Sequence, residues 1–313
     1  MSWILLAVGA QFISAIVALI DKHIVSDEKV FPKPFVYAFY TCLISGAWVI
    51  VYFISLLPLP FGGLNVPSFA NVVRPSLEVV ALSFLAAYTF FTALVAMFSA
   101  LREQDASDVI PVIGAVSALA SFGLGYYFLD AKLSHNFMLG VALLSTGTFL
   151  VSRLKFPFKT AMISLYAGIF FALHYVSIKG LFLATSFDNG FFWSRIAFMF
   201  FALTLLMIPN YWERVHEQTK MMSRKAQLLI IVNKVLAGVS TILILKATDL
   251  GDVAVVQALG GLQFVFILLL GIFFSHGAVH AKVKVGERYD KSTILQKAIF
   301  VAVISLGFLV LFT

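Results

Sequence analysis

The sequence predicts an all-α membrane protein of ten transmembrane helices, arranged as two inverted repeats of five. Three observations lead to this fold class. Hydrophobic residues make up 61% of the 313 residues and charged residues 12%, about half the charged share of an ordinary soluble domain. Ten apolar runs follow one another with polar connections between them. Features of the first half also return in order in the second half, which indicates an internal repeat.

The apolar runs approach the roughly 20 residues that carry a helix across about 30 Å of hydrocarbon. In chain order they are 2–20, 35–56, 77–101, 109–129, 137–151, 161–181, 190–208, 228–245, 253–274 and 294–312. The first run has no Lys or Arg before it and no small-residue cleavage site after it, so we expect a retained helix rather than a signal peptide. We expect the polar stretches 211–225 and 276–292 to be loops.

The predicted repeats are residues 1–156 and 157–313. Each opens with an apolar helix that ends at a lysine, Lys22 in the first repeat and Lys179 in the second. The stretch ALREQDASDVIPVIG at 100–114 also matches ATDLGDVAVVQALGG at 247–261. Because five is an odd number of helices, the second repeat enters the membrane from the opposite side. Inverted repeats of this kind are typical of secondary transporters, whose substrate site lies near the midplane.

The basic residues indicate an orientation. The net charge of +7 does not predict a nucleic-acid partner, because Lys and Arg lie in short loops rather than in one patch. Sixteen of them lie in odd-numbered loops and four in even-numbered loops. The positive-inside rule then places the odd loops in the cytoplasm and both termini outside. We expect a multi-pass protein of a prokaryotic cytoplasmic membrane, as a monomer or a homodimer.

Ten helices in two inverted halves, each with a lysine ending its first helix and a glycine in its fifth (Gly147, Gly307), resemble the EamA-like family of the drug/metabolite transporter (DMT) superfamily. Arg195 resembles the frequent arginine of helix seven, and GER at 286–288 the motif after helix nine. LDAK at 129–132 departs from that motif. The resemblance covers the whole chain and implies metabolite transport through a cavity built from helices one, three, four, six, eight and nine. It also implies cytoplasmic termini, against the charge count, which we follow.

Polar residues at helical spacing predict the faces that line this cavity. The alternative is that they only join helices through hydrogen bonds. The stripes comprise Gln11, Ser14 and Asp21; Tyr88, Thr92 and Ser99; Tyr166, Phe170, His174 and Ser177; Asn233, Lys234 and Thr241; and Gln257, Gly260, Gly261 and Phe264. From these stripes and the buried cations we predict eight substrate-binding residues: Lys234, His174, Arg195, Tyr88, Asn233, Gln257, Tyr166 and Gln11.

Lys234, His174 and Arg195 stand apart because an ionisable side chain at the centre of a bilayer costs about 2.5 to 3.5 kcal/mol. A rise of 1.5 Å per residue places all three roughly 9 to 17 Å from the even-loop surface. We therefore expect one pocket to hold all three. The alternatives are a snorkelling Arg195 and a core His174 with satisfied hydrogen bonds.

No Asp or Glu is expected at the depth of these three residues, which disfavours export of lipophilic cations. The sequence favours an exporter that works by alternating access on an anionic or zwitterionic metabolite, such as an amino acid, an organic acid or a sugar phosphate, with His174 available for proton coupling. A lipophilic-cation or drug exporter and a non-transporting membrane subunit remain alternatives. Because the chain contains no H-E-x-x-H or G-x-S-x-G motif, we expect no enzyme, cofactor or metal site.

Overall fold

The computed structural model describes residues 2–26, 33–54, 67–130, 135–151 and 157–277, together with Val303, Leu306, Gly307 and Val310. Its α-helices are α1 (Ser2–Ser26), α2 (Pro34–Ala47), α3 (Val51–Ile54), α4 (Leu77–Glu103), α5 (Ala106–Phe128), α6 (His135–Val151), α7 (Phe158–Ala184), α8 (Phe187–Leu205), α9 (Pro209–Met221), α10 (Arg224–Leu250), α11 (Val253–Ala258) and α12 (Gly261–Gly277). These ranges contain no strand. Within them, seven helical segments are long and apolar enough to cross a membrane. The chain is thus an all-α, multi-pass membrane protein.

Most helix ends differ from the predicted runs by a few residues, and three differences affect how the helices are divided or where they end. α1 continues six residues past its apolar run, to Ser26. The ninth run is divided into α11 and α12 by a turn at Leu259 and Gly260, where two adjacent glycines weaken the helix. The second run is divided by a 3₁₀ turn, Trp48–Ile50. The tenth run, 294–312, and the GER at 286–288 lie outside the described residues, apart from the four single residues named above.

Part of the expected loop 211–225 is a helix, so that prediction is wrong. α9 follows α8 at an angle of 98° and begins with Pro209, whose fixed φ suits the first turn of a helix. Val215 and Gln218 are its buried residues. The segment is polar overall, and only two of its residues are buried. Its apolar residues are therefore too few to predict a helix.

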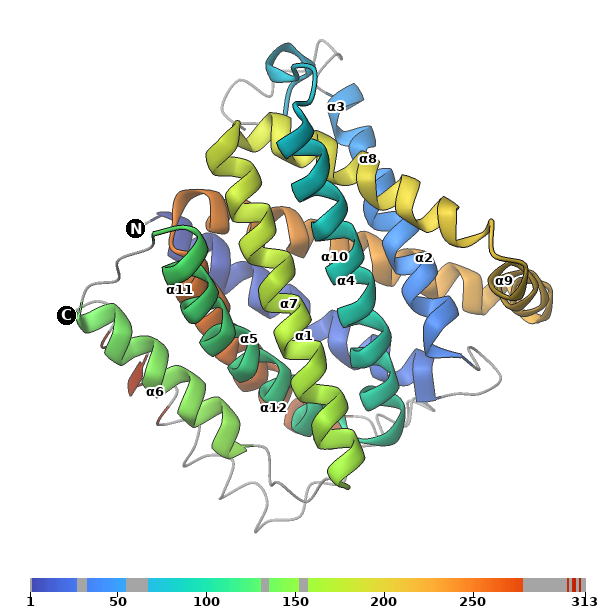
Figure 1. Cartoon of the computed structure of the whole chain (residues 1–313). Coiled ribbons are helices and arrows are strands. Elements are labelled where there is room, and N and C mark those ends of the chain that lie inside the picture. Colours follow the sequence, from blue (N-terminus) through green and yellow to red (C-terminus); the bar gives the residue numbers. More distant parts are fainter. Residues whose placement is uncertain are drawn as a thin grey trace.

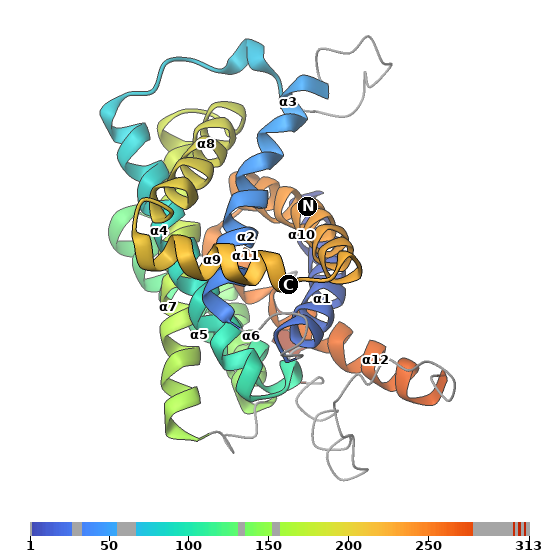
Figure 2. The same cartoon turned by 90° about the vertical axis from the view of Figure 1, so that its right-hand side faces the viewer.

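The helices pack in pairs drawn from the two halves of the chain. α4 lies beside α7 and α1 beside α10, while α2 contacts α8 and α5 contacts α11. Figure 1 shows α4 and α7 side by side, with α1 and α10 behind them. Figure 2 shows the bundle from the side, with α12 extending away from it. α4 and α7 are antiparallel, because His174 meets Ala86 whereas Thr160 meets Glu103.

Glycines allow close approach where these helices cross, as is usual in membrane bundles. A Cβ on Gly46 of α2 would lie 2.7 Å from the backbone nitrogen of Met199 in α8. One on Gly238 of α10 would lie 1.8 Å from Trp48 Nε1. The second contact brings α10 directly against the chain that follows α2.

Lys22 and Lys179 each cap the end of another helix. Lys22 Nζ donates to the carbonyl oxygens of Leu101 and Gln104, 2.7 Å away in each case, at the end of α4. Lys179 Nζ donates at 2.8 to 3.0 Å to three carbonyls at the end of α10, those of Thr248, Asp249 and Gly251. A cation at a helix C-terminus is stabilising because it meets carbonyls that have no partner within the helix.

Candidate functional site: a polar cavity between the helices

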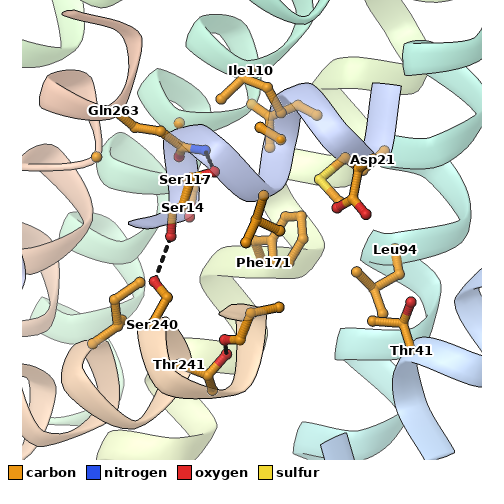
Figure 3. A pocket seen from close by; sticks show the side chains of 18 of the residues that line it. Ser14, Asp21, Thr41, Leu94, Ile110, Ser117, Phe171, Ser240, Thr241 and Gln263 are labelled. Carbon is orange, nitrogen blue, oxygen red and sulfur yellow. Dashed lines mark hydrogen bonds between the residues drawn. The ribbon is translucent and has the colours of Figure 1, made fainter. Parts of the chain in front are cut away.

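A cavity of about 190 Å³ lies among α1, α2, α4, α5, α7, α10, α11 and α12. These include the six helices from which the family resemblance implies a cavity, with α2 in addition. Its lining includes the charged residues Asp21 and Lys234 and the amides of Gln11, Gln257 and Gln263. Apolar side chains such as Phe171 and hydroxyl groups such as that of Thr41 also line it. Figure 3 shows Asp21 on one side of the cavity, and Ser14, Ser117 and Gln263 grouped on the other.

The charged end of the cavity is formed by Asp21 of α1 and Lys234 of α10. Lys234 Nζ lies 2.8 Å from Asp21 Oδ1, and the two side chains are only 3% and 6% exposed. Lys234 Nζ also lies 4.2 Å from the centre of the Tyr37 ring and 5.2 Å from that of Phe98. A cation this deeply buried requires such partners, because desolvation costs several kcal/mol per ion.

Two neutral donors hold the Asp21 carboxylate in place. Asn233 Nδ2 donates to Oδ1 over 2.6 Å, and the Tyr37 hydroxyl donates to the same oxygen. Asn233 precedes Lys234 on α10, so one helix turn supplies both an amide and an ammonium group to the carboxylate. Asn233 is completely buried behind the pair and orients Asp21 rather than facing the cavity.

The expectation that no carboxylate lies at the depth of Lys234 is wrong. Asp21 follows directly after the apolar run of α1, which ends at Ile20. The helix continues to Ser26, and α2 and α10 cover Asp21 with Tyr37 and Lys234. The cavity therefore contains a charge of each sign rather than an excess of positive charge.

The amide end of the cavity is formed by Gln11, Gln257 and Gln263, with Ser14, Ser117 and Ser240 beside them. Ser117 Oγ donates to Gln257 Oε1 over 3.3 Å, and Gln263 Nε2 donates to the carbonyl oxygen of Ser14 over 3.0 Å. The hydroxyls of Ser14 and Ser240 are 2.6 Å apart, and Figure 3 shows this bond. The bond between Ser14 and Ser240 connects α1 to α10, so these two residues both line the cavity and join the helices.

His174 and Arg195 do not share a pocket with Lys234. His174 Nδ1 lies 2.9 Å from the carbonyl oxygen of Ala86, whereas Lys234 lies over Phe98, twelve residues further along α4. At 1.5 Å per residue this is a separation of roughly 18 Å along the helix axis. The ring of His174 packs against Phe90, with centroids 4.9 Å apart.

The Arg195 guanidinium is buried outside the cavity lining. It lies between the rings of Phe191 and Phe198, 4.9 and 4.3 Å from their centres, and Nη1 donates to the carbonyl oxygen of Ser45 over 3.4 Å. Its Nε and Nη2 have no hydrogen-bond partner in the described part of the chain. Arg195 is 1% exposed, so the snorkelling alternative is excluded.

Tyr88 and Tyr166 face away from the cavity. They are 50% and 47% exposed, and both rings contact Phe170. Tyr166 borders a second hollow of about 700 Å³ between α4 and α7, whose lining is almost entirely apolar. The two tyrosines therefore lie at the exposed side of the α4–α7 contact rather than in the cavity.

Three of the eight predicted residues therefore line the cavity (Lys234, Gln11 and Gln257), and Asn233 supports it from behind. Sequence reasoning missed the roles of Asp21, Tyr37 and Gln263. The signal for Asp21 was present, because it shares a helical stripe with Gln11 and Ser14. In the described ranges, no group of three or more His, Cys, Asp and Glu side chains is placed to hold a metal ion.

Comparison with known proteins identifies the fold but no family. No family model and no curated protein matches the sequence. A solved protein crystal structure matches with a TM-score of 0.59 and 15% sequence identity, covering 98% of this chain and 97% of the other. An identity this low shows a shared fold alone. The match extends over nearly the whole chain, so the helices belong to one fold that has been observed experimentally.

Proposed function

We propose that this protein is a secondary transporter, not an enzyme, which exports a small anionic or zwitterionic metabolite by alternating access. The observation that carries this proposal is the Asp21–Lys234 pair at the end of a polar cavity between helices long enough to span a membrane. Ionisable residues inside membrane spans are costly and mark substrate or ion pathways by default. This pair also lines a cavity, which a purely structural pair would not need to do.

Both members of the pair retain hydrogen-bonding capacity. All hydrogen bonds that the structure gives to Asp21 end on Oδ1, which leaves Oδ2 unused within the described residues. Lys234 donates one of its three N–H groups in the same part of the chain. A substrate carboxylate can accept the spare N–H groups of Lys234 while a substrate ammonium donates to Asp21 Oδ2. This favours a zwitterion, such as an amino acid, over an organic acid or a sugar phosphate.

The architecture that we propose is ten helices in two inverted repeats, 1–156 and 157–313, as in the EamA-like family. The helix pairing supports it, because exchanging the two halves converts the α1–α10 pair into α7–α4 and leaves α2–α8 and α5–α11 unchanged. Lys22 and Lys179 support it as well, since each caps the third long helix of its own half. A prokaryotic cytoplasmic membrane and an odd-loops-inside topology belong to the same proposal.

Export of a lipophilic cation is the second candidate, and one observation favours it. Asp21 supplies the buried carboxylate that such an exporter needs to exchange a proton for the cation, and it lines the cavity. Lys234 opposes this candidate, because a cation bound at Asp21 would lie close to a like charge.

Transport by the purified protein in proteoliposomes tests the two candidates. Radiolabelled amino acids, organic acids, sugar phosphates and lipophilic cations would be compared, with empty liposomes as the control. The proposal predicts saturable, protein-dependent flux of a substrate with an acidic group. Flux of cations alone would favour the second candidate. Failure of every solute to move would favour a non-transporting subunit.

A further inference from the structure

The amide end of the cavity contains polar groups that the described residues leave without hydrogen-bond partners. Gln11 is 5% exposed and lines the cavity, yet its amide makes no hydrogen bond within the described residues. Gln257 uses only its oxygen and Gln263 only its nitrogen for the bonds that the structure gives them. Gln11 is buried, whereas Gln257 and Gln263 are half-buried. A buried amide without a partner is uncommon because it costs free energy. The unused donors and acceptors of the three side chains all belong to one end of one cavity.

We propose that the amide end is a second subsite, which binds an uncharged hydrogen-bonding group on the substrate. This inference rests on the proposed function, because it assumes that the charged end binds the acidic or zwitterionic head. Among the described residues, no charged side chain lines the cavity around Gln11, Gln257 and Gln263, so a second ionic group would be desolvated there without compensation. An amide or a hydroxyl matches the three side chains, because the free groups include both donors and acceptors.

The distance between the two ends sets the length of the substrate. Seven residues of α1 separate Ser14 from Asp21 and ten separate Gln11 from Asp21, or roughly 10 to 15 Å along the helix axis. Phe171 lies between the two ends in Figure 3, and Phe90 and Leu94 also line the cavity. The substrate is therefore an elongated molecule with a charged head, a partly apolar middle and a polar, uncharged tail. A small molecule consisting of a head alone would leave the amide end unfilled.

Two matched pairs of ligands test this subsite on the purified full-length protein. Glutamine and methionine form a short pair, and Nε-acetyllysine and S-butylhomocysteine form a long pair that reaches further toward the amide end. The members of each pair share a zwitterionic head and have tails of similar length, one with an amide and one with a thioether. Isothermal titration would give the affinity of each. We expect the amide member of at least one pair to bind about two- to tenfold more tightly, the factor that one neutral hydrogen bond provides.

Gln11→Met is the informative variant, because Gln11 makes no hydrogen bond to another described residue whose loss would disturb its neighbours. It should bring the amide-to-thioether affinity ratio close to one while the thioether ligands bind as before. Gln218→Met is the matched control: Gln218 is equally buried at 5%, its amide is also unpartnered in the described structure, and it lies on α9, outside the cavity lining. This control should keep the parent ratio.

The outcomes separate this inference from the proposed function. Equal affinities within both pairs, or an unchanged ratio in Gln11→Met, would overturn the second subsite and leave transport intact. An amide-to-thioether affinity ratio close to one in Gln218→Met would also overturn the second subsite, since the effect would then not be confined to the cavity. If no molecule with a charged head binds in titration or moves in proteoliposomes, the proposed function fails and the subsite fails with it.

Discussion

The buried Asp21–Lys234 pair should couple the stability of α1 and α10. Removing one partner of a buried ion pair costs about 3 to 5 kcal/mol, because the other charge stays buried without compensation, whereas replacing both is often close to neutral. Lys234→Met leaves Asp21 with two neutral donors, Tyr37 and Asn233. Asp21→Asn leaves Lys234 over the Tyr37 and Phe98 rings, which offset about 0.5 to 2 kcal/mol. We expect each single variant to lose about 3 kcal/mol.

The double variant Asp21→Asn/Lys234→Met should lose less than either single variant. The coupling energy of the resulting cycle is then at least about 3 kcal/mol. Reversible unfolding in detergent, followed by tryptophan fluorescence, would measure all four proteins. Lys246 and Asp249 provide a control cycle, because their 2.9 Å pair is 29% and 21% exposed and should couple by less than about 1 kcal/mol. Additive losses at Asp21 and Lys234 would refute the reasoning.

Three further predictions follow from individual contacts. Gly238→Ala should destabilise the protein by about 1 to 3 kcal/mol, as over-packing does, because the new methyl group meets the Trp48 indole. The same unfolding assay checks this. An unchanged stability would contradict the packing of α10 on the chain after α2. His174→Gln should leave the pH dependence of transport unaltered, since the imidazole lies outside the cavity lining with one nitrogen against Ala86; a flattened profile between pH 5.5 and 8 would restore a proton-coupling role. The proposed topology places α9 in the cytoplasm and Val73 outside. In a Cys42→Ala background, Lys220→Cys on α9 should therefore resist an impermeant thiol reagent on intact cells, while Val73→Cys should react, since both positions are exposed. The opposite pattern would place both termini in the cytoplasm.

Several features could be read from the sequence because they depend on composition and periodicity along one helix. The apolar runs predicted the membrane class, and the described spans confirm it. The stripe through Gln11, Ser14 and Asp21 predicted the face of α1 that lines the cavity. A helix with 3.6 residues per turn places such residues on one side whatever its neighbours are. The paired lysines, Lys22 and Lys179, were visible as a repeat, although their helix-capping role was not.

The depth argument failed for the buried cations in two ways. It placed His174 and Lys234 at a similar level, although their contacts lie roughly 18 Å apart along α4, and it used one coordinate only. The rise per residue estimates how far Lys234, His174 and Arg195 lie along the membrane normal, but not which neighbouring helix each one faces. Packing gives Lys234 a carboxylate from α1, His174 a carbonyl from α4, and Arg195 two phenylalanine rings on its own helix. Three residues at similar estimated depth therefore have three separate environments.

The sequence by itself determined that this chain is a bundle of apolar helices, because burial in a membrane requires long apolar runs whatever the arrangement. Only the tertiary structure decided which polar residues meet. Asp21 and Lys234 are more than 200 positions apart, and their contact exists because α1 packs antiparallel on α10. Tyr88 and Tyr166 likewise lie at the exposed side of the α4–α7 contact, where both rings contact Phe170. Local pattern specifies a helix and its polar face, whereas the partner of that face depends on contacts between distant segments.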